Sequence, residues 1–523
     1  MAGPLLISCG DDDDDDDDGA TPSATTGSGA SAQATPTPGE DFPDEFVIAM
    51  EREPADMLPF FSGFDQAMAM RAVNETLVHV NMTDDNNDGV ADVEYAGVLA
   101  ESWEQADPTE WVYKLRPGVR FHDETPFDAE SVKFNFDLFA DSELVQSLGK
   151  FPIAGRYVQS VEAVDETTLK VTTNAPLVEQ EFFGFGFYLG FASFSPTVYE
   201  AGGGFDGMRT APVGTGPYRF EEWRSGQDMS LSRNEGYWGA LPNFQRLRFI
   251  FRPEAAVRAQ TVASGESHFA YSIGPEQASA LKNSVVGAGF QSNSLRLNNT
   301  KPPTNDIKVR QAINFALDRE AVNDAIFHGT ARPIGFFAYQ PVAVPVWPYD
   351  PQQAMALLDE AGAAGQEVEF IYGEGRLPEE DQLAEVYAAQ IEAIGLKVKL
   401  TKVERAQYGE ISGGEFAQMP EILMETTSSG NYGEISGSLT DKYGCDGSGT
   451  FCSPDWDAEF ATLLSLAGEE RLVKIQDIAT RLQQDETPRA WMLAVNQVHG
   501  LAPNVRATVP LNVYPRIGDL GWA

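Results

Sequence analysis

Residues 99–137 read LAESWEQADPTEWVYKLRPGVRFHDETPFDAESVKFNFD, and the first part of this stretch has the pattern of a strand followed by a turn. Trp111, Tyr113 and Leu115 alternate with other residues, which is the period of a half-buried strand. The dipeptide Pro117-Gly118 comes next. Because proline presets φ and glycine accepts a positive φ, this pair predicts a type II turn.

The second part of the stretch predicts a short strand and a capped helix. Val119 and Phe121 resume the alternation after the turn. Asp128 stands where a helix N-cap is expected, and Glu130 would lie in the first turn, close to the positive end of the helix dipole. An apolar stripe at helical spacing follows, formed by Val132, Phe136 and Phe139.

Two further motifs accompany this stretch. Residues 211–218 read APVGTGPY and are followed by NEGYWG at 234–239, and residues 295–329 read LRLNNTKPPTNDIKVRQAINFALDREAVNDAIFHG. Together with 99–137, they resemble the signatures of the extracytoplasmic solute-binding proteins of ABC importers, family 5, which take up peptides, nickel chelates and other solutes. One departure is Glu124, where that pattern usually has glycine.

The resemblance implies a fold and a division into domains. The expected fold is α/β, of the two-lobed periplasmic-binding-protein type (class II-like), with an extra small domain inserted in the first lobe. The predicted parts are a tether at 1–41, a discontinuous first lobe at 42–82, 206–296 and 495–523, an extra domain at 83–205, and a second lobe at 297–494.

The residues themselves also predict an α/β arrangement in the second lobe. Val368–Tyr372 alternates as a strand, Glu379–Ile394 is an amphipathic helix, and a second strand begins at Leu396. A strand, helix and strand in this order imply parallel pairing with a right-handed crossover. Elsewhere in this lobe, helix N-caps are expected at Asn305, Asp318 and Asp350.

Composition limits the class of protein. A chain of 523 residues can form two or three domains, and 42% hydrophobic residues indicate a globular protein. The formal net charge is −43, to which the run Asp11–Asp18 contributes only eight charges. Nucleic acid is not expected as a partner, because phosphate backbones attract the opposite sign. The acidity predicts a well-solvated surface.

The N-terminus resembles the end of a bacterial lipoprotein signal peptide. Leu6–Cys9 reads LISC, and Cys9 would be the lipidated residue. The preceding apolar segment is shorter than a normal signal sequence, so the start is expected to be truncated. Asp11–Pro38 has the composition of a flexible tether, and no later segment is apolar enough to span a bilayer. The expected location is extracytoplasmic, with a lipid anchor as the only attachment to the membrane.

Two loops have special residue patterns. Cys445 and Cys452 are close enough to form a disulfide in an oxidising compartment, and two free thiols are the alternative. Residues 84–94 place possible oxygen ligands around Gly89, but the twelfth position is Tyr95 instead of a bidentate glutamate. A plain hairpin turn is therefore favoured over a calcium loop, whose ligands would be Asp84, Asn86, Asp88 and Asp92.

No enzyme motif is present in the sequence. GxSxG, HExxH, GxGxxG after a strand and the phosphate loop are all missing. The five histidines are scattered, so a metal site at any of them would depend on the fold. We therefore expect a binding protein that is not an enzyme and uses no cofactor. The alternatives from other classes are a secreted α/β hydrolase and a structural surface lipoprotein.

The resemblance also implies where a solute would bind. Peptide-binding relatives often carry an aspartate near a tryptophan in the segment that here reads METTSSGNYGE, residues 424–434. Both residues are missing, and Glu425 or Glu434 could hold the amino group of a peptide instead. The candidate ligand contacts are Phe61, Ser62, Phe64, Tyr271, Asn298, Glu425, Ser428 and Asn431.

The family mechanism supplies the expected partners. Solute would enter the cleft between the lobes, the lobes would close, and the closed monomer would dock on a membrane permease. Only a ligand that binds the closed state more tightly can shift the population in this way. An oligopeptide is the first expected solute, with a sugar oligomer or a nickel chelate as alternatives.

Overall fold

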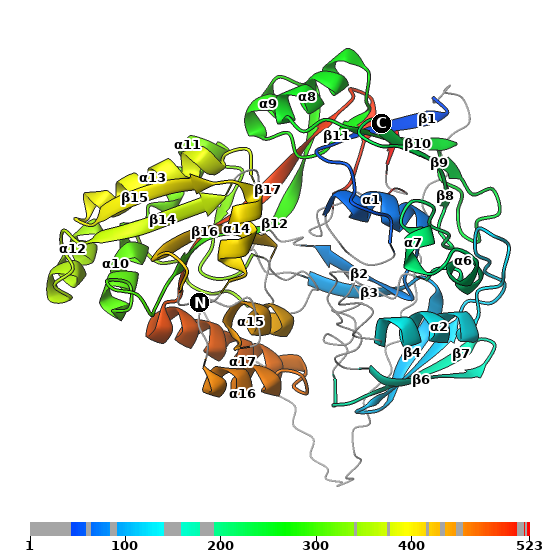
Figure 1. Ribbon diagram of the computed structural model, residues 1–523, viewed down its shortest axis with the longest axis horizontal. Coiled ribbons are helices and arrows are strands. Elements are labelled where there is room, and N and C mark those ends of the chain that lie inside the picture. Colours follow the sequence, from blue (N-terminus) through cyan, green and yellow to red (C-terminus); the bar gives the residue numbers. More distant parts are fainter. Residues whose placement is uncertain are drawn as a thin grey trace, which may run out of the picture. The chain divides into compact units, whose positions relative to one another are not determined.

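The computed structural model describes residues 43–522 with internal gaps (Figure 1). Residues 1–42, 59–63, 84–91, 141–157, 178–192, 339–341, 374–376, 415–417, 429–434, 446–452, 510–516, 518–519 and 523 lie outside the description. Its main feature is an 11-stranded mixed sheet in the order β15-β14-β16-β12-β17-β11-β1-β10-β9-β8, with β13 paired to β17.

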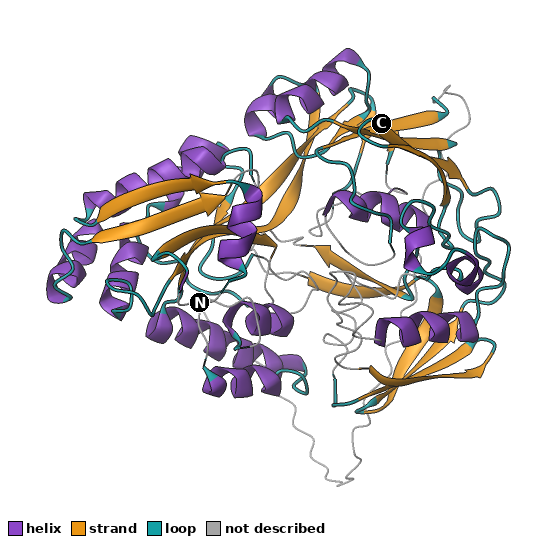
Figure 2. Cartoon of the chain, viewed as in Figure 1, coloured by secondary structure: helices purple, strands orange, loops and turns teal. Residues whose placement is uncertain are grey.

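The strands of this sheet come from distant parts of the sequence. Figure 2 shows them as orange arrows. Their bounds are β1 Glu45–Met50, β8 Tyr218–Arg224, β9 Asp228–Arg233, β10 Arg246–Phe251, β11 Phe269–Ala270, β12 Asn283–Leu297, β13 Arg332–Pro333, β14 Glu367–Gly373, β15 Lys397–Val403, β16 Ile422–Ser428 and β17 Arg489–Leu501.

Two long antiparallel strands, β12 and β17, join the two ends of the sheet. The strands β1 and β8–β11, here called the first half-sheet, continue from the C-terminal end of β17. The strands β14–β16 form the second half-sheet, in which β16 pairs with the C-terminal part of β12, β14 with β16, and β15 with β14. β14 and β15 are parallel, as the predicted strand, helix and strand unit requires.

Helices cover both faces of the second half-sheet. Ile422 and Met424 point into a core that includes α10 and α13, whereas Leu423 between them points into the core of α14 on the other face. Trp491 of β17 contributes to the core that contains α15–α17. The helices are α10 Ile307–Ala316, α11 Arg319–Phe327, α12 Pro351–Glu360, α13 Glu380–Ala393, α14 Arg405–Ser412, α15 Ile435–Tyr443, α16 Pro454–Thr462 and α17 Gly468–Arg481, followed by a π-helical turn η2 Leu482–Glu486.

The predicted N-caps of this region are largely confirmed. The side chains of Asp318 and Asp350 accept hydrogen bonds from backbone N–H groups in the first turns of α11 and α12. The prediction of Asn305 as a cap is wrong. Asp306, one residue later, is the N-cap of α10, and its side chain accepts from the Lys308 N–H. A side-chain oxygen is what the position requires, and either residue could supply one.

Smaller elements complete the chain. The remaining helices include α1 Phe64–Val73, α8 Ala255–Ser264 and α9 Pro275–Ser279. Two short helices, α6 Pro196–Ala201 and α7 Phe205–Met208, share a small core with Phe134 and Leu138. β2 Val78–Thr83 pairs antiparallel with β3 Asp92–Gly97, and β18 Val505–Arg506 pairs antiparallel with β19 Gly521–Trp522. Among the described residues, none of the helices combines the length and the apolar character needed to cross a bilayer.

Residues 99–137 form part of a four-stranded antiparallel sheet and its helix. The sheet has the order β4-β5-β7-β6, and α2 contacts β6 and β7. Its elements are β4 Ala100–Asp107, β5 Glu110–Leu115, β6 Val158–Asp165, β7 Thr168–Thr173 and α2 Ala129–Ala140. Trp111, Tyr113 and Leu115 are buried, as their alternation predicts.

The predicted turn and helix cap in this stretch are also confirmed. Gly118 has a φ of +77°. The Asp128 carboxylate accepts from the Ser131 N–H at 2.8 Å, and the Ser131 hydroxyl accepts from the Asp128 N–H, so the two residues cap α2 reciprocally. The short strand predicted after the turn is not formed. Only an isolated bridge joins Arg120 to Pro126, because the chain bends back at once toward α2.

A buried carboxylate, Glu75, binds residues from the APVGTGPY and NEGYWG stretches. It follows α1 and is 8% exposed. It accepts hydrogen bonds from Thr215 of the APVGTGPY motif and from Tyr237 and Trp238 of the NEGYWG motif, at 2.6–2.9 Å. Burial raises the pKa of Glu75, and the three hydrogen bonds and the charge of Arg116 oppose this shift. The motifs therefore meet in one junction, although they are far apart in the sequence.

The two glycines of APVGTGPY lie directly on the backbone at the end of α1. A Cβ at Gly214 would be 2.2 Å from the Val73 carbonyl oxygen, and one at Gly216 would be 2.7 Å from the same atom. The Gly216 N–H donates to that oxygen at 2.9 Å. His122, from the 99–137 stretch, donates through its backbone N–H to Gly214 O and through Nε2 to Gly216 O.

His122 makes this junction sensitive to acid. Burial lowers the pKa of His122 from 6.5 to about 4, and the charge of Arg219 acts in the same direction. Between these pH values the unfolded chain takes up a proton that the folded protein excludes. The neutral histidine therefore stabilises the fold above pH 6.5, and this contribution is lost as the pH falls toward 4.

We expect His122→Gln to reduce the acid-induced loss of stability. The wild type should lose on the order of 3 kcal/mol through this residue between pH 6.5 and pH 4, at about 1.4 kcal/mol per pKa unit. The glutamine amide nitrogen takes nearly the place of the histidine Nε2, so it can still donate to Gly216 O, but it does not titrate. Urea unfolding at each pH measures the slope. His328→Gln, at the exposed C-cap of α11, is the control, and an unchanged slope in His122→Gln would contradict the prediction.

Candidate functional site

The two half-sheets present their carboxyl ends to each other. Ala270, at the end of β11, pairs with Gly500 of β17. Because the two strands are antiparallel, β11 points toward the N-terminal end of β17. Ser428, at the end of β16, pairs with Gln291 of β12, and Gln291 pairs with Val495 of β17. β16 therefore points toward the C-terminal end of β17, opposite to β11. About 17 Å of β17 separates the two ends, at 3.3 Å per residue. Ligands of open α/β sheets bind beside the carboxyl ends of strands, so this is the candidate site.

A buried arginine holds the carboxyl edge of the first half-sheet. Arg258 of α8 donates to the carbonyl oxygens of Tyr271 and Ser272, and also to those of Arg252 and Pro253 after β10. Ser272 has a positive φ of +47° and donates its N–H to Nδ1 of His499. These contacts fix the loops that follow β10 and β11.

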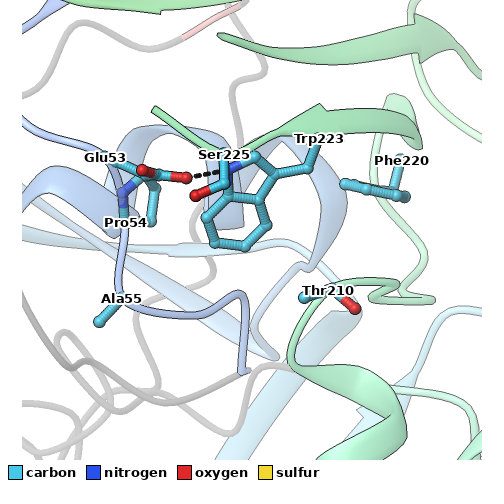
Figure 3. A pocket seen from close by; sticks show the side chains of 7 residues that line it. All are labelled: Glu53, Pro54, Ala55, Thr210, Phe220, Trp223 and Ser225. Carbon is cyan, nitrogen blue, oxygen red and sulfur yellow. Dashed lines mark hydrogen bonds between the residues drawn. The ribbon is translucent and has the colours of Figure 1, made fainter. Parts of the chain in front are cut away.

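The same edge carries a pocket of about 630 Å³ (Figure 3). Its lining comes from the loop after β1, from the residue two positions after α7, and from the end of β8. In Figure 3, Trp223 lies between Glu53 and Phe220, and Ala55 and Thr210 lie below the indole in this view. The lining residues are Glu53, Pro54, Ala55, Thr210, Phe220, Trp223 and Ser225.

Glu53 joins the loop after β1 to the hairpin between β8 and β9. The indole Nε1 of Trp223 donates to one carboxylate oxygen at 2.6 Å, and the Gly226 N–H donates to the other at 2.8 Å. The side chains of Glu53 and Trp223 are half-buried and line the pocket, so the carboxylate and the indole are accessible from it. The pocket therefore combines a negative charge with aromatic surface.

The carboxyl half of β16 carries a buried charge cluster around Glu425, which is 6% exposed. Its carboxylate lies 2.6 Å from Nη1 of Arg489, 3.5 Å from Nζ of Lys442 and 3.9 Å from Nε of Arg296. Arg489 also donates to the Ser294 hydroxyl at 3.0 Å. These residues come from the adjacent strands β16, β12 and β17 and from α15, so the cluster joins α15 to the sheet.

Burial and charge act in opposite directions on Arg489. Burial is the largest single effect and lowers its pKa, but the charge of Glu425, the hydrogen bond to Glu425 and the neighbouring Tyr443 and Tyr408 together outweigh it, so the pKa of Arg489 is raised. The guanidinium also lies over aromatic rings, 5.4 Å from the centre of Trp491 and 5.9 Å from that of Tyr443. The sequence motifs do not predict the three cationic residues of this cluster, Arg296, Arg489 and Lys442. Their spacing in the sequence carries no signal, because strand pairing and α15 bring them to Glu425.

The structure separates the predicted ligand contacts. The Tyr271 ring lies 5.1 Å from that of His499, in the part of β17 next to the first half-sheet. Glu425 pairs with Ser294 of β12, which in turn pairs with Trp491 of β17. These two positions of β17, Trp491 and His499, are eight residue steps apart, which is about 26 Å. Tyr271 and Glu425 thus belong to opposite carboxyl edges, and their roles as ligand contacts stay predictions.

Asn298 lies at the other end of β16. Its amide donates to Met419 O at 3.0 Å, and its side-chain oxygen accepts from the N–H and hydroxyl of Thr300. It is fully buried, and these bonds shape the turn after β12. A ligand role for Asn298 stays a prediction.

Several predicted positions cannot be placed. Phe64 begins α1 and Ser428 ends β16, but their side chains are not described. Phe61, Ser62, Asn431 and Glu434 lie outside the described residues, as do Cys9 and residues 84–91 of the proposed calcium loop. Cys445 is disulfide-bonded, and Cys452 is not among the described residues, so the predicted pairing stays a prediction. No group of three potential metal ligands occurs in the part of the chain that the structure describes.

Known proteins resemble the chain over most of its length. Residues 94–430 match the family described as bacterial extracellular solute-binding proteins, family 5 Middle. The chain is 29% identical over 361 residues to the glutathione-binding protein GsiB of Pectobacterium atrosepticum, covering 67% of this chain and 69% of that protein.

Two solved structures share the fold. The periplasmic binding protein DppA from Helicobacter pylori, in complex with the peptide STSA, aligns with a TM-score of 0.74 and 22% identity, covering 91% of this chain and 98% of that one. NikA from Brucella suis, in complex with Fe(III)-EDTA, aligns with a TM-score of 0.77 and 23% identity, covering 92% and 100%.

Proposed function

The chain belongs to the bacterial extracellular solute-binding proteins of family 5, and from that premise we propose that it binds a peptide between the carboxyl edges of its two half-sheets. The observation that carries the proposal is the register of β17, along which the ends of β11 and β16 face each other. Both edges offer polar and aromatic side chains beside strand ends, where ligands of such sheets bind.

Membership of the family settles the class of the protein. It has the two-lobed α/β fold of periplasmic binding proteins and serves an ABC importer as a transport binding protein, not as an enzyme. The hydrolase alternative is therefore set aside. A binding protein of this kind works when ligand stabilises one arrangement of the lobes over another, because only a difference in affinity shifts the population.

The relatives support a peptide as the solute. GsiB is named for glutathione, which is a tripeptide, and DppA was solved with the peptide STSA. The NikA structure contains an iron chelate and supports a metal chelate as the second candidate. A sugar oligomer finds no such support. Of these solutes, a peptide fits best with a site that has carboxylate, hydroxyl and aromatic groups.

The proposal includes a permease partner and a lipid anchor. The family acts outside the cytoplasm, and the permease of the importer would accept the solute from the loaded protein. We infer that Cys9 carries the lipid, that the acidic tether separates it from the folded part, and that the protein acts as a monomer.

Thermal unfolding with added solutes tests the proposed ligand class. The probes are reduced glutathione, the tetrapeptide STSA, nickel with histidine, and maltotriose. A ligand at 100 times its Kd stabilises the folded state by about 2.7 kcal/mol, so a bound peptide should raise Tm clearly. We expect at least one peptide to do so. Stabilisation by nickel-histidine or maltotriose alone would contradict the proposal.

A further inference from the structure

We propose that the pocket between Glu53 and Trp223 binds a cationic group of the solute, a guanidinium or an ammonium. The inference rests on the proposed function and further specifies that the solute carries a positively charged group. Figure 3 shows the three features that carry it: a carboxylate, an indole beside it, and an open space lined by small and hydroxyl-bearing side chains.

The first argument is the charge of Glu53. Its two oxygens accept hydrogen bonds from neutral donors, the Trp223 indole and the Gly226 N–H. No cationic side chain of the described residues lies within ion-pair distance of it. A carboxylate offers about four acceptor positions, so two protein donors leave room for a ligand.

Neighbouring carboxylates differ from Glu53 in this respect. Glu51 pairs with Arg52 at 3.6 Å, and Asp56 pairs with Arg209 at 3.2 Å. Asp228, at the start of β9, faces both Arg224 and Arg248. The carboxylates near Glu53 are thus neutralised by arginines of the protein, whereas a cationic group of the solute can neutralise Glu53.

The second argument is the aromatic surface. Trp223 and Phe220 line the pocket, and tryptophan is the best partner for a cation placed over its face. The hydrogen bond from Nε1 to Glu53 holds the indole in place, so the ring does not have to be ordered when the solute binds. A cation in this pocket would meet the carboxylate and the ring together.

The third argument comes from the opposite edge. Glu425 already has three cationic neighbours, Arg489, Lys442 and Arg296, within 4 Å. Its charge is therefore compensated inside the protein, and a cationic ligand group would gain little there. Of these two carboxylates, Glu53 is the better acceptor for a cation.

Paired peptides test the inference in the wild type. Ala-Arg-Ala and Ala-citrulline-Ala have almost the same shape, but citrulline replaces the guanidinium by a neutral urea. Titration calorimetry should give at least about tenfold tighter binding of the arginine peptide, and the ratio should fall as salt is raised. This comparison requires no variant, so it does not depend on the folding of a mutant.

Two variants assign the preference to the pocket. Glu53→Gln should reduce the ratio to within about twofold, whereas Glu222→Gln should keep the wild-type ratio. Glu222 is an exposed glutamate of the same strand as Trp223 and does not line the pocket. Both variants change the net charge equally, so a general electrostatic effect would lower both ratios.

The outcomes separate the inference from the proposed function. Equal binding of the two peptides by the wild type overturns the cationic pocket and leaves peptide binding intact. A preference that survives Glu53→Gln also overturns it. If neither these peptides nor glutathione and STSA bind, the proposed function fails, and the inference that rests on it fails as well.

Discussion

Replacing Glu425 by alanine is expected to lower the free energy of unfolding by about 3–5 kcal/mol, the usual cost of breaking a buried ion pair by removing one partner. The substitution would leave Arg489, Lys442 and Arg296 in a buried site without the carboxylate that lies within 4 Å of all three. The cluster joins α15 to three strands of the sheet, so its loss should weaken the contact between these elements. Urea unfolding followed by circular dichroism measures the change.

Two further variants show whether charge is the cause. Glu425→Gln keeps the size of the side chain and should retain most of the loss, because the amide carries no charge. Glu369→Ala removes a half-buried glutamate that pairs with the exposed Lys399 at 2.9 Å, and should cost less than about 1 kcal/mol. A loss at Glu425 no larger than that at Glu369 would show that the buried cluster does not stabilise the fold.

Gly214→Ala is expected to destabilise the junction of the sequence motifs by about 3 kcal/mol, at the upper end of the cost of overpacking. The new Cβ would lie 2.2 Å from the Val73 carbonyl oxygen and 2.8 Å from the Asn74 Cα. Both neighbours are backbone atoms at the end of α1, just before Glu75. They can move only by disturbing the hydrogen bonds that Thr215, Tyr237 and Trp238 make to that carboxylate.

A second glycine in open space is the matched control. Gly409 lies within α14, and a Cβ there would meet no atom within 4 Å. Gly409→Ala should therefore raise the stability by about 0.5–1 kcal/mol, because alanine is the better helix former. The two substitutions add the same atom in different surroundings. Equal stability changes would mean that the close approach at Gly214 has no energetic effect.

Local patterns in the sequence predicted individual elements well. The alternation at Trp111, Tyr113 and Leu115 and the caps at Asp128 and Asp318 depend on residues a few positions apart, and the structure confirms them. The misplaced cap at Asn305 is of the same kind, because two adjacent residues could both provide the oxygen and only the exact path of the chain selects Asp306.

Local patterns could not predict contacts between residues that are far apart in the sequence. Glu425 and Arg489 are 64 positions apart, and Glu53 and Trp223 are 170 positions apart. Neither pair has a spacing that a helix or a strand would repeat. Glu425 was a candidate because of its motif, but its three cationic neighbours and the pocket at Glu53 had no counterpart in the sequence analysis.

The family could be recognised from the motifs in the sequence. Periodicity, capping and turn chemistry act over a few residues, so they were enough to indicate the α/β class and many of the individual strands and helices. Only the tertiary structure shows that Glu425 is neutralised by cations inside the protein and that Glu53 faces a pocket. That difference depends on the register of β12, β16 and β17 and on the return of the chain from β1 to β8, which bring charges together across the sheet.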